Sequence, residues 1–170
     1  MSVVALHIPS NRAQAAAFRR PAYGFTLLEL MLAGAVCALL VAVALPSYQS
    51  IVERQKVGQC VRDLMTISIK IEQYRTMHGF KPPMSLADLG AIPMRDPWGF
   101  NYRYLNFGVG VPGTQAKIRK DRNLTPINTE FDLYSVGADG VSMPPLTARQ
   151  SLDDVVWARD GGFVGIATDF

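Results

Sequence analysis

The chain has 170 residues, a length that predicts one globular domain plus an appendage. It contains 17 Lys or Arg and 14 Asp or Glu, which gives a formal net charge of +3. The charge is uneven: residues 1–24 contain three arginines and no acid, and removing them leaves 14 basic against 14 acidic residues. Because the remainder is formally neutral, the basic balance of the whole chain does not indicate a nucleic-acid partner.

Residues 1–24 are predicted to be a leader that takes no part in the fold. Its arginines, Arg12, Arg19 and Arg20, fit the rule that positive segments stay on the cytoplasmic side of a membrane. An apolar run from Phe25 to Leu45 follows, in which Glu29 is the only charged residue. Because about 20 residues at 1.5 Å rise each cross the hydrocarbon core of a bilayer, this run predicts a single membrane span.

Glu29 is an unusual residue for such a span, because a charge at mid-bilayer costs at least roughly 2.5 kcal/mol. We therefore expect a positive group to meet its carboxylate. The alternative is an ordinary signal anchor that happens to contain one acid.

One long helix is predicted from Phe25 to about His78, with a possible kink at Pro46. Gly79 is the predicted C-cap of this helix. Beyond Pro46, apolar residues recur at steps of three and four, which predicts a stripe that packs on a sheet. The stripe consists of Val57, Val61, Leu64, Ile67 or Ser68, Ile71 and Tyr74.

The second half of the chain reads as short strands separated by turns. We expect a short helix over Ser85–Leu89, a turn at residues 96–99 and strands at residues 101–105 and 131–136. A last short strand or extended tail is expected at residues 161–167. The fold class is therefore α+β, a long N-terminal helix on a small antiparallel sheet. The domains are the leader (1–24), the membrane half of the helix (25–46) and a globular domain (47–170).

In one continuous helix, about 35 Å of helix length separates Cys37 from Cys60. This distance is too large for a disulfide between them. Both are interpreted as apolar packing residues rather than redox or metal groups, with a disulfide between two chains as the alternative. A basic group, Lys117, Arg119, Lys120 and Arg122, is interpreted as a solvated loop tip, with contact to an acidic partner as the alternative.

Three aspartates flank the last long loop. Asp139 lies in a Gly-Ala-Asp-Gly turn, and Asp153 and Asp154 lie on the far side of the loop. Calcium takes six to eight oxygen ligands from carboxylates, hydroxyls and carbonyls, so this loop is a candidate calcium site, with the Ser142 hydroxyl as a further ligand. The alternative is that the aspartates only cap and form turns.

The segment Gly24-Phe25-Thr26-Leu27-Leu28-Glu29 resembles the prepilin motif of type IV pilins and type II secretion pseudopilins. The segments from Asp96 to Tyr104 and from Phe131 to Gly140 resemble the major pseudopilin of type II secretion in particular. The resemblance implies a pilin-like fold. Two features depart from the family pattern: Pro144-Pro145 with the long link up to Ser151, and the long tail from Val164 to Phe170.

The resemblance also implies how the chain is processed and assembled. A prepilin peptidase would cut after Gly24 and methylate the new terminus, Phe25. The Glu29 carboxylate of one subunit would then meet the Phe25 amine of its neighbour in the filament. The family places Ca²⁺ in the last loop, which here would be held by Asp139, Asp153 and Asp154.

From these residues we expect a structural subunit of a type II secretion pseudopilus, with a type IV pilin or minor pilin for adhesion, motility or DNA uptake as the alternative. A monomeric anchored periplasmic binding domain is a further alternative. The implied partners are further copies of the chain, the prepilin peptidase, an inner-membrane assembly platform, minor pseudopilins and membrane lipid, with no nucleic acid. The implied location is the bacterial inner membrane, with the C-terminal domain in the periplasm. The sequence contains no nucleophile elbow, Walker loop or zinc spacing, so no enzyme is predicted.

Overall fold

A computed structural model describes residues 24–109 and 114–170. It divides the chain into two compact units, one up to Val43 and one from Ala44 to Phe170. Apart from Gly24, the predicted leader lies outside the described residues.

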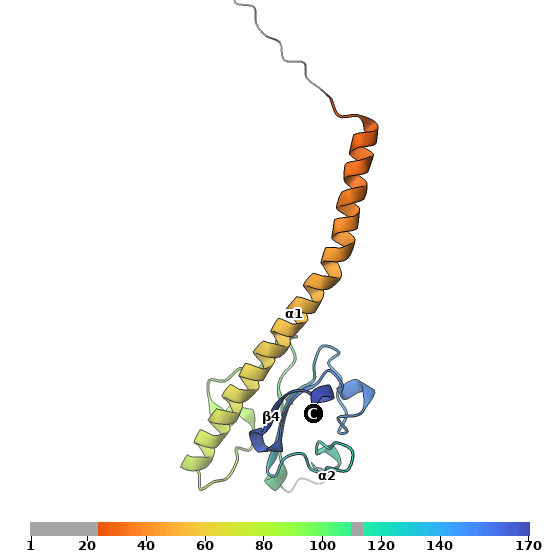
Figure 1. The fold of residues 1–170 in the computed structure, drawn as a ribbon. Coiled ribbons are helices and arrows are strands. Elements are labelled where there is room, and N and C mark those ends of the chain that lie inside the picture. Colours follow the sequence, from red (N-terminus) through yellow and green to blue (C-terminus); the bar gives the residue numbers. More distant parts are fainter. Residues whose placement is uncertain (1–23, 110–113) are drawn as a thin grey trace, which may run out of the picture. The chain divides into compact units, whose positions relative to one another are not determined.

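The long helix α1 runs from Leu27 to Met77 and contains Pro46 (Figure 1). Its ends agree with the predicted helix to within two residues. From Phe25 to Val43 the side chains are exposed, and α1 is the one helix in the described part of the chain that is long and apolar enough to cross a membrane. The predicted C-cap is confirmed: Gly79 has a φ of 67°, and the Phe80 N–H donates to the Arg75 carbonyl at 2.8 Å. These features end a helix in a Schellman motif.

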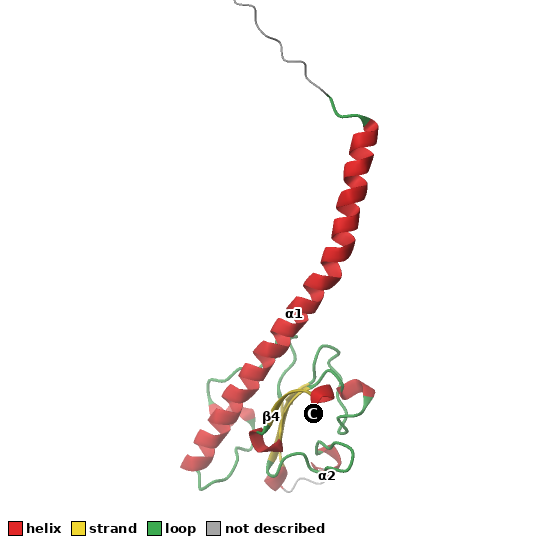
Figure 2. Ribbon diagram, in the orientation of Figure 1, coloured by secondary structure: helices red, strands yellow, loops and turns green. Residues whose placement is uncertain are grey.

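Four short strands form one antiparallel sheet in the second unit (Figure 2). They are β1 (Arg103–Asn106), β2 (Phe131–Ser135), β3 (Val155–Ala158) and β4 (Phe163–Ile166), and they lie side by side in chain order. Leu133 of β2 is opposite Tyr104 of β1 and Trp157 of β3. The predicted α+β class is confirmed, and the strands expected near residues 101–105, 131–136 and 161–167 correspond to β1, β2 and β4.

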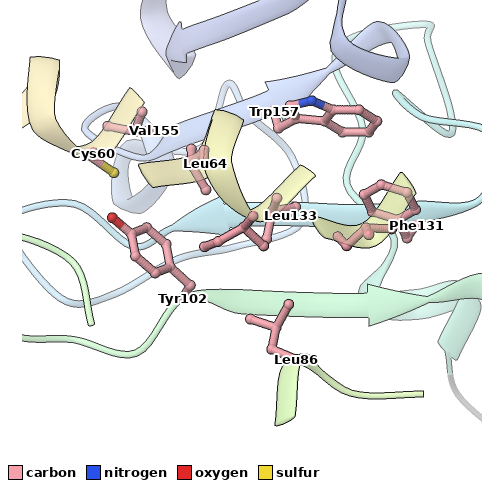
Figure 3. Packing of buried hydrophobic residues seen from close by; sticks show 10 residues of the cluster. Cys60, Leu64, Leu86, Tyr102, Phe131, Leu133, Val155 and Trp157 are labelled. Carbon is pink, nitrogen blue, oxygen red and sulfur yellow. The ribbon is translucent and has the colours of Figure 1, made fainter. Parts of the chain in front are cut away.

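The main core lies between one face of the sheet and the part of α1 after Ala44 (Figure 3). The helix contributes Cys60, Leu64, Ile67 and Ile71, all fully buried. Across from them, the rings of Phe131 and Trp157 stack with centroids 4.8 Å apart. The predicted stripe is confirmed from Val57 to Ile71, with Ile67 rather than Ser68 as its buried member. Its last residue, Tyr74, stacks on His78 instead of joining this core. Cys60 is a fourth buried residue on this side of the helix, and the predicted stripe did not include it.

Both cysteines are free thiols in the single chain. Cys60 packs in the main core, and burial raises the pKa of its thiol to about 11. The thiol is therefore protonated near neutral pH and behaves as an apolar group. Cys37 is exposed in the first unit, so the packing interpretation is not borne out for it among the described residues.

A smaller core covers the other face of the sheet. It joins Val156 and Ala158 of β3 to residues from loops: Ile127, Leu146 and Ala167. Strand β3 therefore contributes to both cores, and all four of its residues are buried. β3 was not predicted as a strand, because a strand buried on both faces lacks the alternation of apolar and polar residues that marks a half-exposed strand.

The connections contain short helical turns, including the predicted one at Leu86–Leu89 (η1), where the Asp88 carboxylate accepts the Ser85 N–H at 2.8 Å. The others are η2 (Phe107–Val109), α2 (Thr114–Lys117), η3 (Arg149–Ser151), η4 (Arg159–Gly161) and η5 (Ala167–Asp169). The prediction of a solvated basic loop tip was wrong for Arg119, whose side chain is only 1% exposed. Lys117, Lys120 and Arg122 are exposed, as expected.

Candidate functional site

The start of α1 brings the predicted processing and assembly residues together. Gly24 and Phe25 are exposed and lie two to three residues before the first residue of the helix, Leu27. Thr26 is the residue before the first helical position, and its Oγ1 accepts the Glu29 backbone N–H at 3.2 Å. This bond satisfies one of the backbone N–H groups that a helix start leaves unpaired. Thr26 and Glu29 together match the capping signature T-x-x-E. This signature is present in the sequence and marks the helix start, although the predicted start at Phe25 did not rest on it.

Glu29 lies in the first turn of α1. The positive end of the helix dipole favours a carboxylate at that position. If the chain began at Phe25, its terminal amine would lie within about one helical turn of this carboxylate. The described residues thus place a negative side chain and a potential positive terminus at one end of an apolar helix.

The last loop, residues 136–154, connects β2 to β3 and begins with a tight turn. Asp153 holds this turn, because its Oδ2 accepts the N–H groups of Ala138 at 2.8 Å and Asp139 at 3.0 Å. Gly137 has a φ of 69°, and a Cβ there would lie 2.4 Å from the Asp153 carbonyl oxygen, so only glycine fits. Asp139 accepts the Val141 N–H at 2.8 Å, which forms an Asx turn.

Asp154 is separate from this turn and fully buried. Its Oδ2 accepts a hydrogen bond from the Ser142 hydroxyl at 2.6 Å and pairs with the guanidinium of Arg119. Arg119 also donates to the Ser142 hydroxyl and to the Met143 carbonyl. The only trace of this pairing in the sequence is the presence of four basic residues between β1 and β2.

The three predicted calcium ligands do not fit a single ion as they are placed here. Asp139 and Asp153 bind backbone N–H groups, and Asp154 is neutralised by Arg119. Within residues 24–109 and 114–170, no group of three or more His, Cys, Asp or Glu side chains is arranged to hold a metal. Asp139 and Asp153 instead form and cap the turn, which is the alternative that the sequence left open. Calcium binding itself stays a prediction.

A second buried acid supports the same region from β2. Asp132 is fully buried; its Oδ2 accepts the Arg119 backbone N–H at 2.7 Å, and its Oδ1 accepts the Asn128 amide at 3.1 Å. Burial raises the pKa of Asp132 to about 6, although these hydrogen bonds act to lower it. Burial likewise raises the pKa of Asp154 to about 6, against the lowering effect of Arg119. Both acids are therefore mostly ionised at neutral pH.

These raised pKa values predict a pH dependence of stability. A carboxylate whose pKa is higher in the folded than in the unfolded chain binds more protons when folded. Its contribution to stability is greatest below the unfolded pKa and is lost as the pH rises through about 6. Lowering the pH from about 7 to about 5 should thus add about 1 kcal/mol of stability from Asp132 alone.

The variant Asp132→Asn should show a smaller rise in unfolding temperature over this pH range than the wild type. Circular dichroism melts at the two pH values measure the difference, and Asp169→Asn, at an exposed acid, is the matched control. Equal pH slopes for wild type and Asp132→Asn would contradict the assignment.

Comparison with curated proteins gives two relatives. The chain is 28% identical over 143 residues to type II secretion system core protein G of Pseudomonas aeruginosa, an alignment that covers 72% of this chain and 87% of that protein. It is 33% identical over 94 residues to type IV major pilin protein PilE1 of Neisseria gonorrhoeae, covering 55% of this chain and 44% of that protein. No protein-family model matches the chain, and no solved structure matches it significantly. The two relatives confirm the resemblance to major pseudopilins and type IV pilins, and with it the pilin-like character of the fold.

Proposed function

We propose that this protein is a structural subunit of a type II secretion pseudopilus, a pseudopilin that polymerises through its N-terminal helix. The observation that carries the proposal is the composition of α1. Its first part is an exposed apolar segment with one acid in its first turn, and its second part packs on the sheet of the globular unit. The similarity to a type II secretion core protein over 72% of the chain supports the same function.

In the proposed mechanism, a prepilin peptidase removes residues 1–24 and methylates Phe25. Before assembly the apolar part of α1 lies in the inner membrane, with the globular unit in the periplasm. Assembly moves this part from lipid into the filament interior, where the Glu29 carboxylate of one subunit pairs with the Phe25 amine of the next. The pairing compensates two charges that would each be costly in an apolar layer, and it sets the register between subunits.

The proposed partners follow from this mechanism. They are other copies of the chain, the prepilin peptidase, the inner-membrane assembly platform, the minor pseudopilins and membrane lipid. No catalytic role is proposed, since the work of a pseudopilus subunit is mechanical.

A type IV pilin is the second candidate function, favoured by the match to PilE1 over 94 residues. The two candidates differ in the machine that accepts the subunit. A secretion pseudopilus serves protein export, and a type IV pilus forms long surface fibres.

Replacement of the major subunit in each machine separates the candidates. We expect the chain to restore export in cells that have a type II secretion system but lack its major pseudopilin, when the secreted enzyme is assayed in the culture medium. We expect no restoration of twitching in cells that lack their major pilin. Restored twitching without restored export would favour the pilin function instead.

A further inference from the structure

Arg119 lies at the centre of the loop region where calcium was predicted. It precedes β2 in the chain, and its backbone N–H is held by Asp132 of that strand. The next residue, Lys120, forms a bridge to the last loop: its N–H donates to the Pro144 carbonyl at 3.0 Å, and its carbonyl accepts the Leu146 N–H at 2.8 Å. Hydrogen bonds therefore hold the backbone at Arg119 and Lys120 to both the sheet and the last loop.

The guanidinium of Arg119 is surrounded by oxygen atoms from the last loop and its end. They are a carboxylate oxygen of Asp154, the Ser142 hydroxyl and the Met143 carbonyl, the last at 2.6 Å. The ring of Tyr134 covers the guanidinium at 4.3 Å from its centroid and supplies a further attraction for a cation. Carboxylate, hydroxyl and backbone carbonyl are also the groups that bind a hard metal ion in a loop.

Charge balance at Asp154 favours the guanidinium over a metal. One buried carboxylate faces one buried guanidinium, so the pair is neutral as it stands. A divalent ion at the same carboxylate would lie beside the fixed positive charge of Arg119. Asp139 and Asp153 accept backbone N–H groups of the turn, which hold their carboxylates at that turn. The second Asp154 oxygen, Oδ1, is buried and has no hydrogen-bond partner among the described residues.

We propose that the Arg119 guanidinium is the built-in cation of the last loop, which it ties to Asp154, Ser142 and Met143 so that the loop closes without calcium. The loop between β2 and β3 is thereby closed by a side chain of an earlier segment. The smaller core beneath it, with Leu146 and Val156, depends on the same closure.

Thermal unfolding of the full mature chain in detergent tests the proposal. We expect the wild type to unfold at the same temperature in excess calcium chloride and in EGTA. A wild-type unfolding temperature that rises with calcium, while magnesium has no effect, would overturn the proposal. This comparison needs no variant, so it decides the question even if a variant does not fold.

Substitutions then test the role of the pair. Arg119→Met keeps an unbranched side chain at this position but removes its charge, which leaves Asp154 buried without its cation. The unfolding temperature should therefore fall on the order of 10 °C. Lys120→Met, the same change at the exposed neighbour, should have little effect. The double variant Arg119→Met with Asp154→Asn should lose less than the two single variants together, because each single variant strands the other charge. Equal small losses for Arg119→Met and Lys120→Met, or full additivity in the double variant, would contradict the role assigned to the pair.

Discussion

Gly24→Glu should leave residues 1–24 attached to the chain in cells that contain an active prepilin peptidase. The reason is local: Gly24 has no side chain, and a charged, bulky residue would sit at the bond to be cut. The chain's own structure should not change, because Gly24 is exposed and a Cβ there would meet nothing within 4 Å. The expected effect is therefore complete loss of cleavage without loss of fold.

Intact-mass measurement of membrane-extracted protein detects this directly. The wild type should have lost residues 1–24 and carry an extra methyl group at Phe25, and Gly24→Glu should keep the full mass. Gly34→Ala is the control, since a Cβ at Gly34 also meets nothing within 4 Å and lies inside the span. A wild-type chain that retains the leader would refute the processing step on which assembly depends.

Glu29→Gln and Glu29→Ala should abolish filament assembly and still enter the membrane at least as well as the wild type. Insertion should not suffer, because the change removes a charge whose burial costs at least roughly 2.5 kcal/mol at mid-bilayer. Assembly should fail, because the amine at Phe25 of the next subunit would be buried without its partner, at a cost of about 3 to 5 kcal/mol per subunit contact. Glutamine is the sharper change, since it keeps the size of the side chain.

Thr26→Ala is the matched control for Glu29. It removes the hydroxyl that accepts the Glu29 N–H, which costs about 1 kcal/mol at the helix start, but it keeps the carboxylate. If the charge of Glu29 is what assembly requires, Thr26→Ala should still form filaments. Loss of filaments in Thr26→Ala together with normal filaments in Glu29→Gln would show that the helix cap, and not the charge, matters.

The elements with a strong local pattern were predictable from the sequence. The α1 helix has period-3.6 burial at Leu64, Ile67 and Ile71 and a glycine at its end, so its range, stripe and cap all follow from local rules. Strand β3 was not predictable by alternation, because Val155 and Trp157 pack on one core and Val156 on the other. Its neighbours in the sheet, not its own sequence, decide that it is a strand.

The last loop was only partly predictable for a related reason. The turns at Asp139 and Asp153 are local and carry a Gly-rich signature. The partner of Asp154 is distant in sequence: Arg119 lies before β2 and reaches the loop only through the fold. A cluster of basic residues usually stays solvated, and nothing in the sequence separates Arg119 from Lys117 or Lys120. Tertiary placement alone decides which of these cations is buried.

In the proposed assembly, the mature chain polymerises through the start of α1. Its most direct test is electron microscopy of the processed wild-type protein after detergent removal, alongside Glu29→Gln prepared in the same way. The proposal predicts thin filaments from the wild type and only dispersed or membrane-bound subunits from Glu29→Gln. A wild-type preparation that stays monomeric under conditions in which the leader has been removed would contradict it and would favour an anchored monomeric domain.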